Sequence, residues 1–119
     1  METHTIVSER FPYLEVAWAA GPTGREDWAY LDTGYTGFFI VPEALLAELG
    51  PPQFTVRLGL GDGRQVDAYG FWGSVRIMGS GQSFPGRILA LSMEFLLGRQ
   101  VTDRFKLTFD HGQRILVEL

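Results

Sequence analysis

The stretch Ala29–Val41, with the sequence AYLDTGYTGFFIV, decides how the rest of the chain is interpreted. One apolar segment runs into Asp32, Thr33 and Gly34, and a second apolar segment follows them. Such a turn can be an ordinary β-turn, because Asp and Thr side chains readily hydrogen-bond their own backbone. The flanking apolar residues, however, predict that the Asp32 carboxylate is at least partly buried, where an unpaired charge is costly or takes up a proton. An ordinary turn and a functional carboxylate both stay open at this point.

Short apolar segments separated by Gly and Pro lie on both sides of this stretch and predict a mostly β domain. Strands are expected at Tyr13–Ala20 and Asp27–Leu31, joined as a hairpin by the turn Gly21–Arg25. The apolar segment Phe38–Val41 is short enough to be a buried strand. The fold is therefore expected to be built around paired strands that lead into and out of the Asp32 turn.

A different periodicity follows in the segment PEALLAELG, from Pro42 to Gly50. Leu45, Leu46 and Leu49 would share one face of a helix. Proline in the first turn and glycine after the last are typical helix boundaries. We expect a short helix here.

The second half of the chain predicts two further hairpins. The longer one covers Phe54–Met78 around the tip Gly61-Asp62-Gly63, because Asp-Gly supplies the positive φ angles of a tight turn. The remaining expected elements are a turn at Gly79–Gln82, a strand at Arg87–Leu91, one or two helical turns at Met93–Leu97, and a closing hairpin of Lys106–Asp110 with Arg114–Leu119.

Composition restricts the classes of partner. A length of 119 residues suits one domain, and the net charge of −4 argues against a nucleic-acid partner. The absence of cysteine excludes disulfides, thiolate metal sites and a thiol nucleophile. His4 and His111 lie at opposite ends without metal-ligand spacing, so no metal and no cofactor are expected. Residues 1–10 contain no apolar run, and we therefore expect no membrane segment and a cytoplasmic location.

The triplet Asp32-Thr33-Gly34 after a hydrophobic strand resembles the active-site motif of aspartic proteases, specifically the single-domain retropepsin-like members. The resemblance covers about residues 13–119. It includes the helix after the triplet, the glycine-tipped hairpin at Leu60–Arg64 in the place of the flap, and the block Ile88–Leu96 that leads into Phe105–Asp110. It implies a mostly β fold: one domain, residues 1–119, forming a closed retropepsin-like (acid protease) barrel with one or two short helices.

The resemblance also implies roles for individual residues. Asp32 corresponds to the catalytic carboxylate, Thr33 to the residue whose hydroxyl holds two catalytic loops together, and Gly34 to a position that lets the substrate backbone approach. The substrate-binding residues that it implies are Tyr35, Thr36, Leu60, Gly61, Asp62 and Gly63. From the residues alone, Tyr35 could equally be a core aromatic, and the hairpin could be a plain surface hairpin.

One position departs from the family pattern. The segment LALSMEFL, residues 89–96, resembles the apolar-apolar-Gly block that packs behind the catalytic loop, and Ser92 stands where that glycine would be. Glycine allows two backbones to approach closely, whereas serine adds a Cβ and a hydroxyl. This departure motivates an alternative function, a non-catalytic peptide-binding or assembly module on the same fold.

The implied chemistry needs two carboxylates about 3 Å apart that share one proton. The chain has one Asp-Thr-Gly turn, so a second chain must supply the other carboxylate. A two-fold homodimer does so, because a residue near the axis meets its own copy. The predicted function is an aspartic endopeptidase, active as a homodimer, that hydrolyses an extended peptide or protein substrate. A half-enzyme that pairs only with a different Asp-Thr-Gly chain is a further alternative.

The closing strand ILVEL, residues 115–119, leaves two pairings open. It could pair with a partner chain, since an unpaired apolar edge strand is a template for association. It could equally complete the hairpin with Lys106–Asp110 inside one chain.

Overall fold

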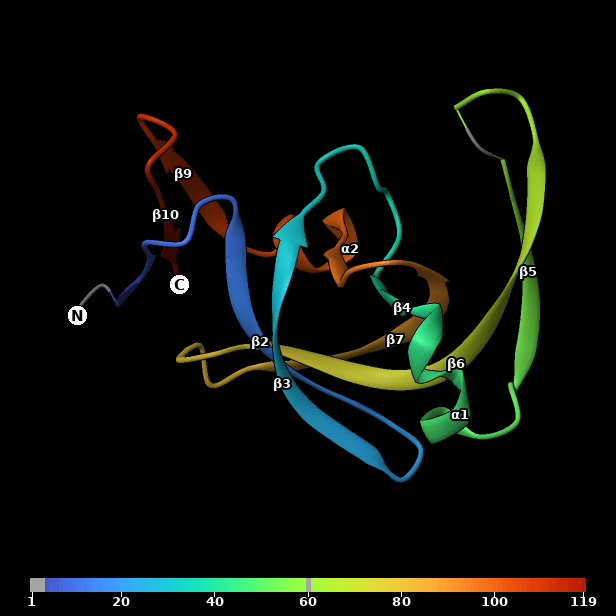
Figure 1. Cartoon of the computed structure of the whole chain (residues 1–119). Helices are drawn as coiled ribbons and strands as arrows, with labels where there is room; N and C mark the ends of the chain where they lie inside the picture. The colour runs from blue at the N-terminus through green and yellow to red at the C-terminus, as the bar shows by residue number, and fades with distance from the viewer. Residues whose placement is uncertain (1–3, 60) are drawn as a thin grey trace.

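The computed structural model describes residues 4–59 and 61–119, and these are mainly β-strands (Figure 1). The strands are β1 (Thr5–Ser8), β2 (Tyr13–Ala20), β3 (Thr23–Leu31), β4 (Phe39–Pro42), β5 (Phe54–Gly59), β6 (Gln65–Ile77), β7 (Ser83–Ser92), β8 (Leu96–Leu97), β9 (Lys106–Asp110) and β10 (Arg114–Glu118). The helical elements are one 3₁₀ turn (Glu43–Leu45) and the short helices α1 (Leu46–Leu49) and α2 (Arg99–Thr102). No helix in the described part of the chain is long and apolar enough to cross a membrane.

Six of the strands close into a barrel. They are hydrogen-bonded in the order β2-β3-β8-β4-β7-β6, and β2 also pairs with β6, which completes the ring. Strand β5 pairs only with the outer half of β6, and this hairpin stands away from the barrel body in Figure 1. The predicted fold class, a mostly β closed barrel with short helical elements, is confirmed.

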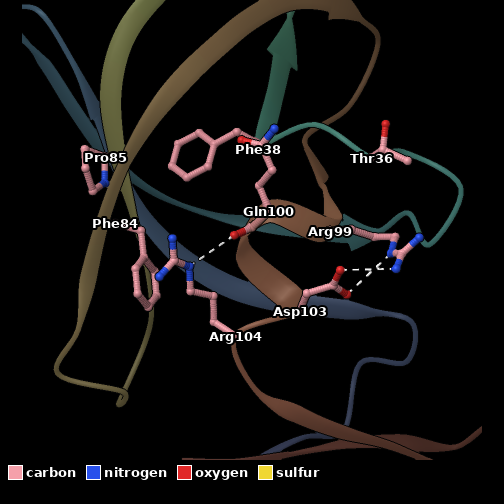
Figure 2. Close-up of a pocket in the computed structure, with 8 residues that line it drawn as sticks. All are labelled: Thr36, Phe38, Phe84, Pro85, Arg99, Gln100, Asp103 and Arg104. Atoms are coloured by element: carbon pink, nitrogen blue, oxygen red, sulfur yellow. Dashed lines mark hydrogen bonds and ion pairs between the residues drawn. The ribbon is translucent and has the colours of Figure 1, made fainter.

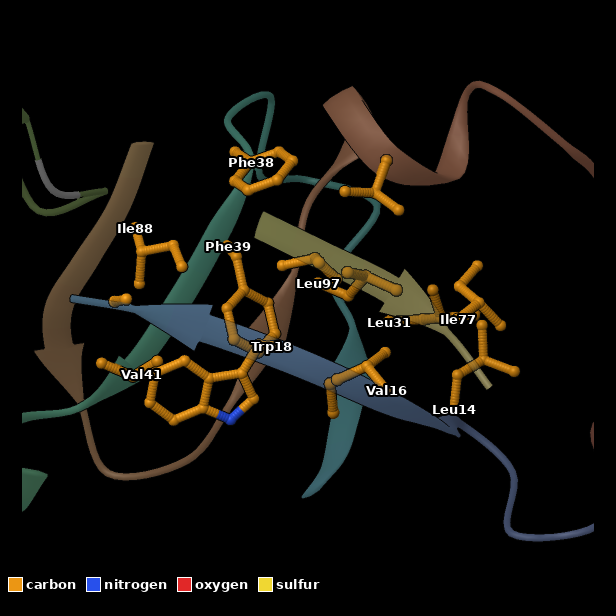
Figure 3. Packing of buried hydrophobic residues seen from close by; sticks show 14 of the residues in the cluster. Leu14, Val16, Trp18, Leu31, Phe38, Phe39, Val41, Ile77, Ile88 and Leu97 are labelled. Atoms are coloured by element: carbon orange, nitrogen blue, oxygen red, sulfur yellow. The ribbon is translucent and has the colours of Figure 1, made fainter. Parts of the chain in front are cut away.

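Buried and partly exposed residues alternate strictly along β2, so one face of this strand lies in the core. Leu14, Val16 and Trp18 are buried, while the residues between them are partly exposed. The Trp18 ring packs against Phe39 of β4, and its indole N–H donates to the Asp27 carboxylate at 2.9 Å, so the buried indole keeps a hydrogen bond. Figure 3 shows the apolar side chains of β2 meeting Phe39 in the core. The core therefore fixes β3 and β4, the two strands on either side of the Asp32 turn.

The first half of the chain largely follows the predictions. Strand β2 has the predicted bounds, and β3 begins four residues earlier than expected because its pairing with β2 continues to Thr23 opposite Ala20. The segment from Pro42 to Gly50 is helical as expected, divided into a 3₁₀ turn and α1, and Gly50 ends it with a φ of +79°.

The predicted helical turns at Met93–Leu97 are wrong. Leu96 and Leu97 form β8, which pairs in parallel with Tyr30 and Leu31 and antiparallel with β4. The helix begins instead at Arg99. Pairing with two strands that are distant in the sequence overrides the local helical preference of this segment.

A small second sheet has the order β1-β10-β9. Strand β1 had no sequence-based prediction, and it pairs with β10 from Thr5 opposite Glu118 to Ser8 opposite Ile115. Strand β9 pairs with the other edge of β10. Both edges of the closing strand are thus paired within one chain, and the intrachain hairpin of the two alternatives is confirmed.

Candidate active site

Asp32 immediately follows β3 and is half-buried, as the apolar residues around it predicted. Its backbone N–H donates to the carbonyl of Leu97 at 3.1 Å. Its carboxylate oxygen Oδ1 accepts the N–H of Gly34 at 3.0 Å, and its carbonyl accepts the N–H of Tyr35 at 3.1 Å. The turn therefore holds the carboxylate by its own backbone. Thr33 and Gly34 are exposed on this turn.

A second segment supports the turn through a row of backbone hydrogen bonds. The N–H groups of Gly98, Arg99 and Gln100 donate to the carbonyls of Phe38, Tyr35 and Gly37 at 3.0, 2.9 and 3.0 Å. These bonds join the start of α2 to the loop that follows Asp32. Two segments that are distant in the sequence are thus joined by backbone hydrogen bonds into one support for the carboxylate.

The glycine of this support is Gly98. A Cβ at this position would lie 2.3 Å from the carbonyl oxygen of Gly37, closer than real Cβ contacts allow. The apolar-apolar-Gly block that packs behind the loop is therefore Leu96-Leu97-Gly98, directly before α2. The assignment of Ser92 to the glycine position is wrong. The triplet Leu-Leu-Gly in the sequence was the signal that could have identified the block.

Ser92 ends β7, and its hydroxyl donates to the backbone carbonyl of Glu94. Replacing Ser92 by Gly is expected to lower the free energy of unfolding by only about 0.5–2 kcal/mol, through one lost hydrogen bond and a more flexible unfolded chain. Urea denaturation measures this change. A loss above about 4 kcal/mol would show that Ser92 is part of the support, because surface substitutions rarely reach that size.

Tyr35 combines the two roles that the sequence left open. Its ring covers Gly37 and Gly98, since a Cβ at either glycine would lie within 2.7 Å of ring atoms. Burial raises the pKa of the Tyr35 hydroxyl, and the nearby Asp32 charge raises it further, whereas the Phe38 backbone N–H and the Arg87 charge lower it. The same side chain lines two cavities at the surface. Tyr35 is thus both packed and available to a ligand.

Asp32 opens onto a cavity of about 440 Å³ between the turn and the β5–β6 hairpin. Its lining consists of Asp32, Gly34, Tyr35, Thr36, Ile40, Leu58, Gly59 and Leu91. The predicted residues Asp32, Gly34, Tyr35 and Thr36 therefore come together. The other four lining residues were not predicted from the sequence, because β4, β5 and β7 contribute them from distant parts of the chain: Ile40, Leu58, Gly59 and Leu91.

The predicted tip of the hairpin does not line this cavity. Gly61, Asp62 and Gly63 are exposed, and the Asp62 carboxylate pairs with Arg64 at 2.6 Å. Leu60 lies outside the described residues. Contact with the cavity instead comes from Leu58 and Gly59, at the end of the β5 arm.

A larger cavity of about 700 Å³ contains no residue of the Asp32-Thr33-Gly34 turn (Figure 2). Its charged groups already have partners within the cavity wall: Arg99 pairs with Asp103 at 3.2 Å, and Arg104 covers the Phe84 ring at 4.8 Å. Among residues 4–59 and 61–119, no three His, Asp or Glu side chains are grouped to hold a metal ion. The cavity at Asp32 is therefore the better candidate for an active site.

Comparisons with known proteins agree with this geometry at the level of the fold. No family model matches the chain, and no curated protein matches its sequence. A retropepsin-like aspartic protease from Rickettsia conorii superimposes with a TM-score of 0.60 at 17% identity, over 98% of this chain and 92% of that one. The simian foamy virus (mac) protease superimposes with a TM-score of 0.55 at 22% identity, over 76% of this chain and 91% of that one. The chain has the retropepsin-like fold. Both of these similar structures are proteases.

Proposed function

We propose that this protein is an aspartic endopeptidase that acts as a homodimer through paired Asp32 carboxylates. The observation that carries the proposal is the position of Asp32: half-buried, held by a hydrogen-bonded turn and facing a cavity under a hairpin of the retropepsin-like fold. Ser92, which motivated the alternative of a binding module, is not the glycine of the loop support, since Gly98 holds that position, and it no longer favours that alternative.

In the proposed mechanism the two Asp32 carboxyl groups lie about 3 Å apart and share one proton, because two like charges at that distance do not both ionise. The ionised group takes a proton from a water molecule held between the pair. The protonated group donates to the oxygen of the scissile carbonyl, and the water oxygen attacks its carbon. In the collapse of the tetrahedral intermediate, the carboxyl group that took the water proton gives it to the leaving nitrogen as the C–N bond breaks, and a hydroxyl of the intermediate returns a proton to the other carboxylate. The products are a carboxylic acid and an amine. No covalent enzyme intermediate forms.

The second carboxylate is proposed to come from an identical chain. Thr33 and Gly34 are exposed beside Asp32 in the single chain, and this leaves the turn accessible to its own copy across a two-fold axis. The Thr33 hydroxyl is proposed to hydrogen-bond across the two turns. Since both edges of β10 are already paired within the chain, the dimer contact is assigned to the region of the turn.

The proposed substrate is an extended peptide or protein segment. Such a segment can pair with the β5–β6 hairpin as an added strand, so that backbone hydrogen bonds provide most of the recognition. Ile40, Leu58 and Leu91 give the cavity beside Asp32 an apolar lining. Apolar side chains are therefore expected next to the scissile bond.

The purified protein is incubated with denatured protein substrates across roughly pH 4 to pH 7 and is expected to cleave them, because the proposed mechanism needs one protonated and one ionised carboxyl group. Mass spectrometry of the products should find new termini with apolar residues beside the cut. Sedimentation of the same sample gives the oligomeric state. Peptide binding without new termini would indicate a binding module, and a strictly monomeric, inactive protein would favour a half-enzyme with a different partner.

A further inference from the structure

A smaller cavity of about 210 Å³ adjoins the one at Asp32 and shares Tyr35, Thr36 and Leu58 with it. Val56 and Leu89 add apolar surface to its wall. Arg87 is the one charged side chain among the described residues that line this cavity. The cavity therefore combines an apolar wall with a single positive charge.

The strand pattern explains why Arg87 faces the cavity. Side chains alternate along β7, so Arg87 and Leu89 share the face opposite the buried Ile88. Both Arg87 and Leu89 line the cavity, whereas Ile88 packs in the barrel core.

Aromatic rings border the guanidinium of Arg87 on the side of the hairpin. Trp72 lies directly opposite Arg87 in the pairing of β6 with β7, and its side chain is 58% exposed. The Phe54 ring lies 5.3 Å from the Trp72 ring and 6.0 Å from the guanidinium. The arginine thus lies at the edge of the cavity beside a partly exposed aromatic surface.

Arg87 has no carboxylate partner within 4.0 Å among residues 4–59 and 61–119, although other arginines of the chain do. On the neighbouring β5–β6 hairpin, for example, Arg57 pairs with Asp67 at 3.1 Å. The charge of Arg87 also reaches Tyr35, which lines both cavities. Burial raises the Tyr35 pKa, and the Arg87 charge opposes part of that rise. Its charge is therefore available to a ligand in the cavity.

We propose that this cavity is a subsite for an acidic side chain of the bound peptide, Asp or Glu, with Arg87 as the residue that selects it. This inference rests on the proposed function. In an extended peptide, residues i and i+2 point to the same face and lie about 7 Å apart. The two adjoining cavities can each hold one side chain of such a pair. The acidic residue is therefore assigned two positions away from the apolar residue that fills the cavity at Asp32.

Binding to the full-length Asp32→Asn variant tests the subsite without cleavage of the peptide. Two extended peptides with an apolar central pair are compared by calorimetry, one with Glu and one with Gln at the assigned position. The Glu peptide is expected to bind about fivefold more tightly at low salt, since a partly exposed charge pair contributes up to about 1 kcal/mol. Added salt should reduce this preference. Equal affinities for the two peptides would overturn the inference.

Arg87→Gln in the same background is expected to remove the preference for Glu. Arg57→Gln is the matched control: it removes one positive charge from β5 of the neighbouring β5–β6 hairpin, outside the cavity lining, and should leave the preference unchanged. A preference that survives Arg87→Gln, or is lost equally in Arg57→Gln, would also overturn the inference.

The chain with Asp32 intact is incubated with the same two peptides. Cleavage without a preference for Glu contradicts only the subsite. Preferred binding of Glu without any cleavage contradicts only the proposed enzyme. A peptide pair that is neither bound nor cut contradicts both.

Discussion

Replacing Asp32 by Asn is expected to abolish peptide cleavage, with a fall in rate on the order of 10⁴-fold or more. In the proposed homodimer one substitution removes both carboxylates, so neither a general base nor a general acid remains. Asn has nearly the same shape as Asp, and its amide oxygen can still accept the Gly34 N–H that Asp32 accepts at 3.0 Å. The fold and the dimer should therefore persist. Initial cleavage rates and sedimentation measure the two properties separately.

Asp67→Asn is the matched control for this experiment. Asp67 is exposed on β6 and pairs only with Arg57 in the described part of the chain, outside the cavity at Asp32. The control should keep the cleavage rate within about threefold, because an exposed ion pair contributes less than about 1 kcal/mol. Undiminished cleavage by Asp32→Asn would end the aspartic protease proposal.

Gly98→Ala is expected to destabilise the protein by about 3 kcal/mol or more. The added Cβ would lie 2.3 Å from the Gly37 oxygen and 2.8 Å from the Gly37 carbonyl carbon. Both atoms belong to the backbone, so relief requires moving the loop away from α2 and breaking the row of hydrogen bonds that joins them. Urea denaturation measures the loss of stability, and cleavage should fall with it because the same loop carries Asp32.

Gly24→Ala is the control for the glycine substitution. Gly24 lies in β3, and a Cβ there would meet only the Trp18 carbonyl oxygen at 4.0 Å, an ordinary contact. Its effect should stay within about 1 kcal/mol. Similar stabilities for the two alanine variants would contradict the close approach of Gly98 to the loop.

Local patterns predicted those parts of the site that depend on neighbours in the sequence. The half-buried state of Asp32 follows from apolar residues on both sides, and the hairpins follow from Gly-containing turns between β-rich arms. The strand β8 and the glycine of the loop support depend on contacts between segments far apart in the chain. The triplet Leu96-Leu97-Gly98 carries a motif signal for the glycine, but no local periodicity shows which distant strands Leu96 and Leu97 pair with. A helix was therefore predicted at Met93–Leu97, and Ser92 was assigned to the position that Gly98 holds.

The residues that line the cavities also divide into those that local sequence predicted and those that depend on distant strands. Tyr35 and Thr36 follow the motif directly, and both line the cavity at Asp32 as expected. Leu58 and Arg87 reach the cavities from β5 and β7, through alternation along strands whose register was unknown from the sequence. A shift of one residue in that register would turn Arg87 away from the cavity.

The antiparallel pairing of β1 with β10 has a consequence for the proposed association of two copies of the protein. The first and last strands pair with each other: Thr5 lies opposite Glu118, and the Leu119 N–H donates to the His4 carbonyl at 3.2 Å. In the proposed dimer, subunits would join through preformed surfaces, without exchanging strands or unfolding their termini. Association of this kind is reversible and follows mass action. Proteolysis by the proposed dimer would then depend on protein concentration, and would be low in dilute protein and rise as the protein accumulates.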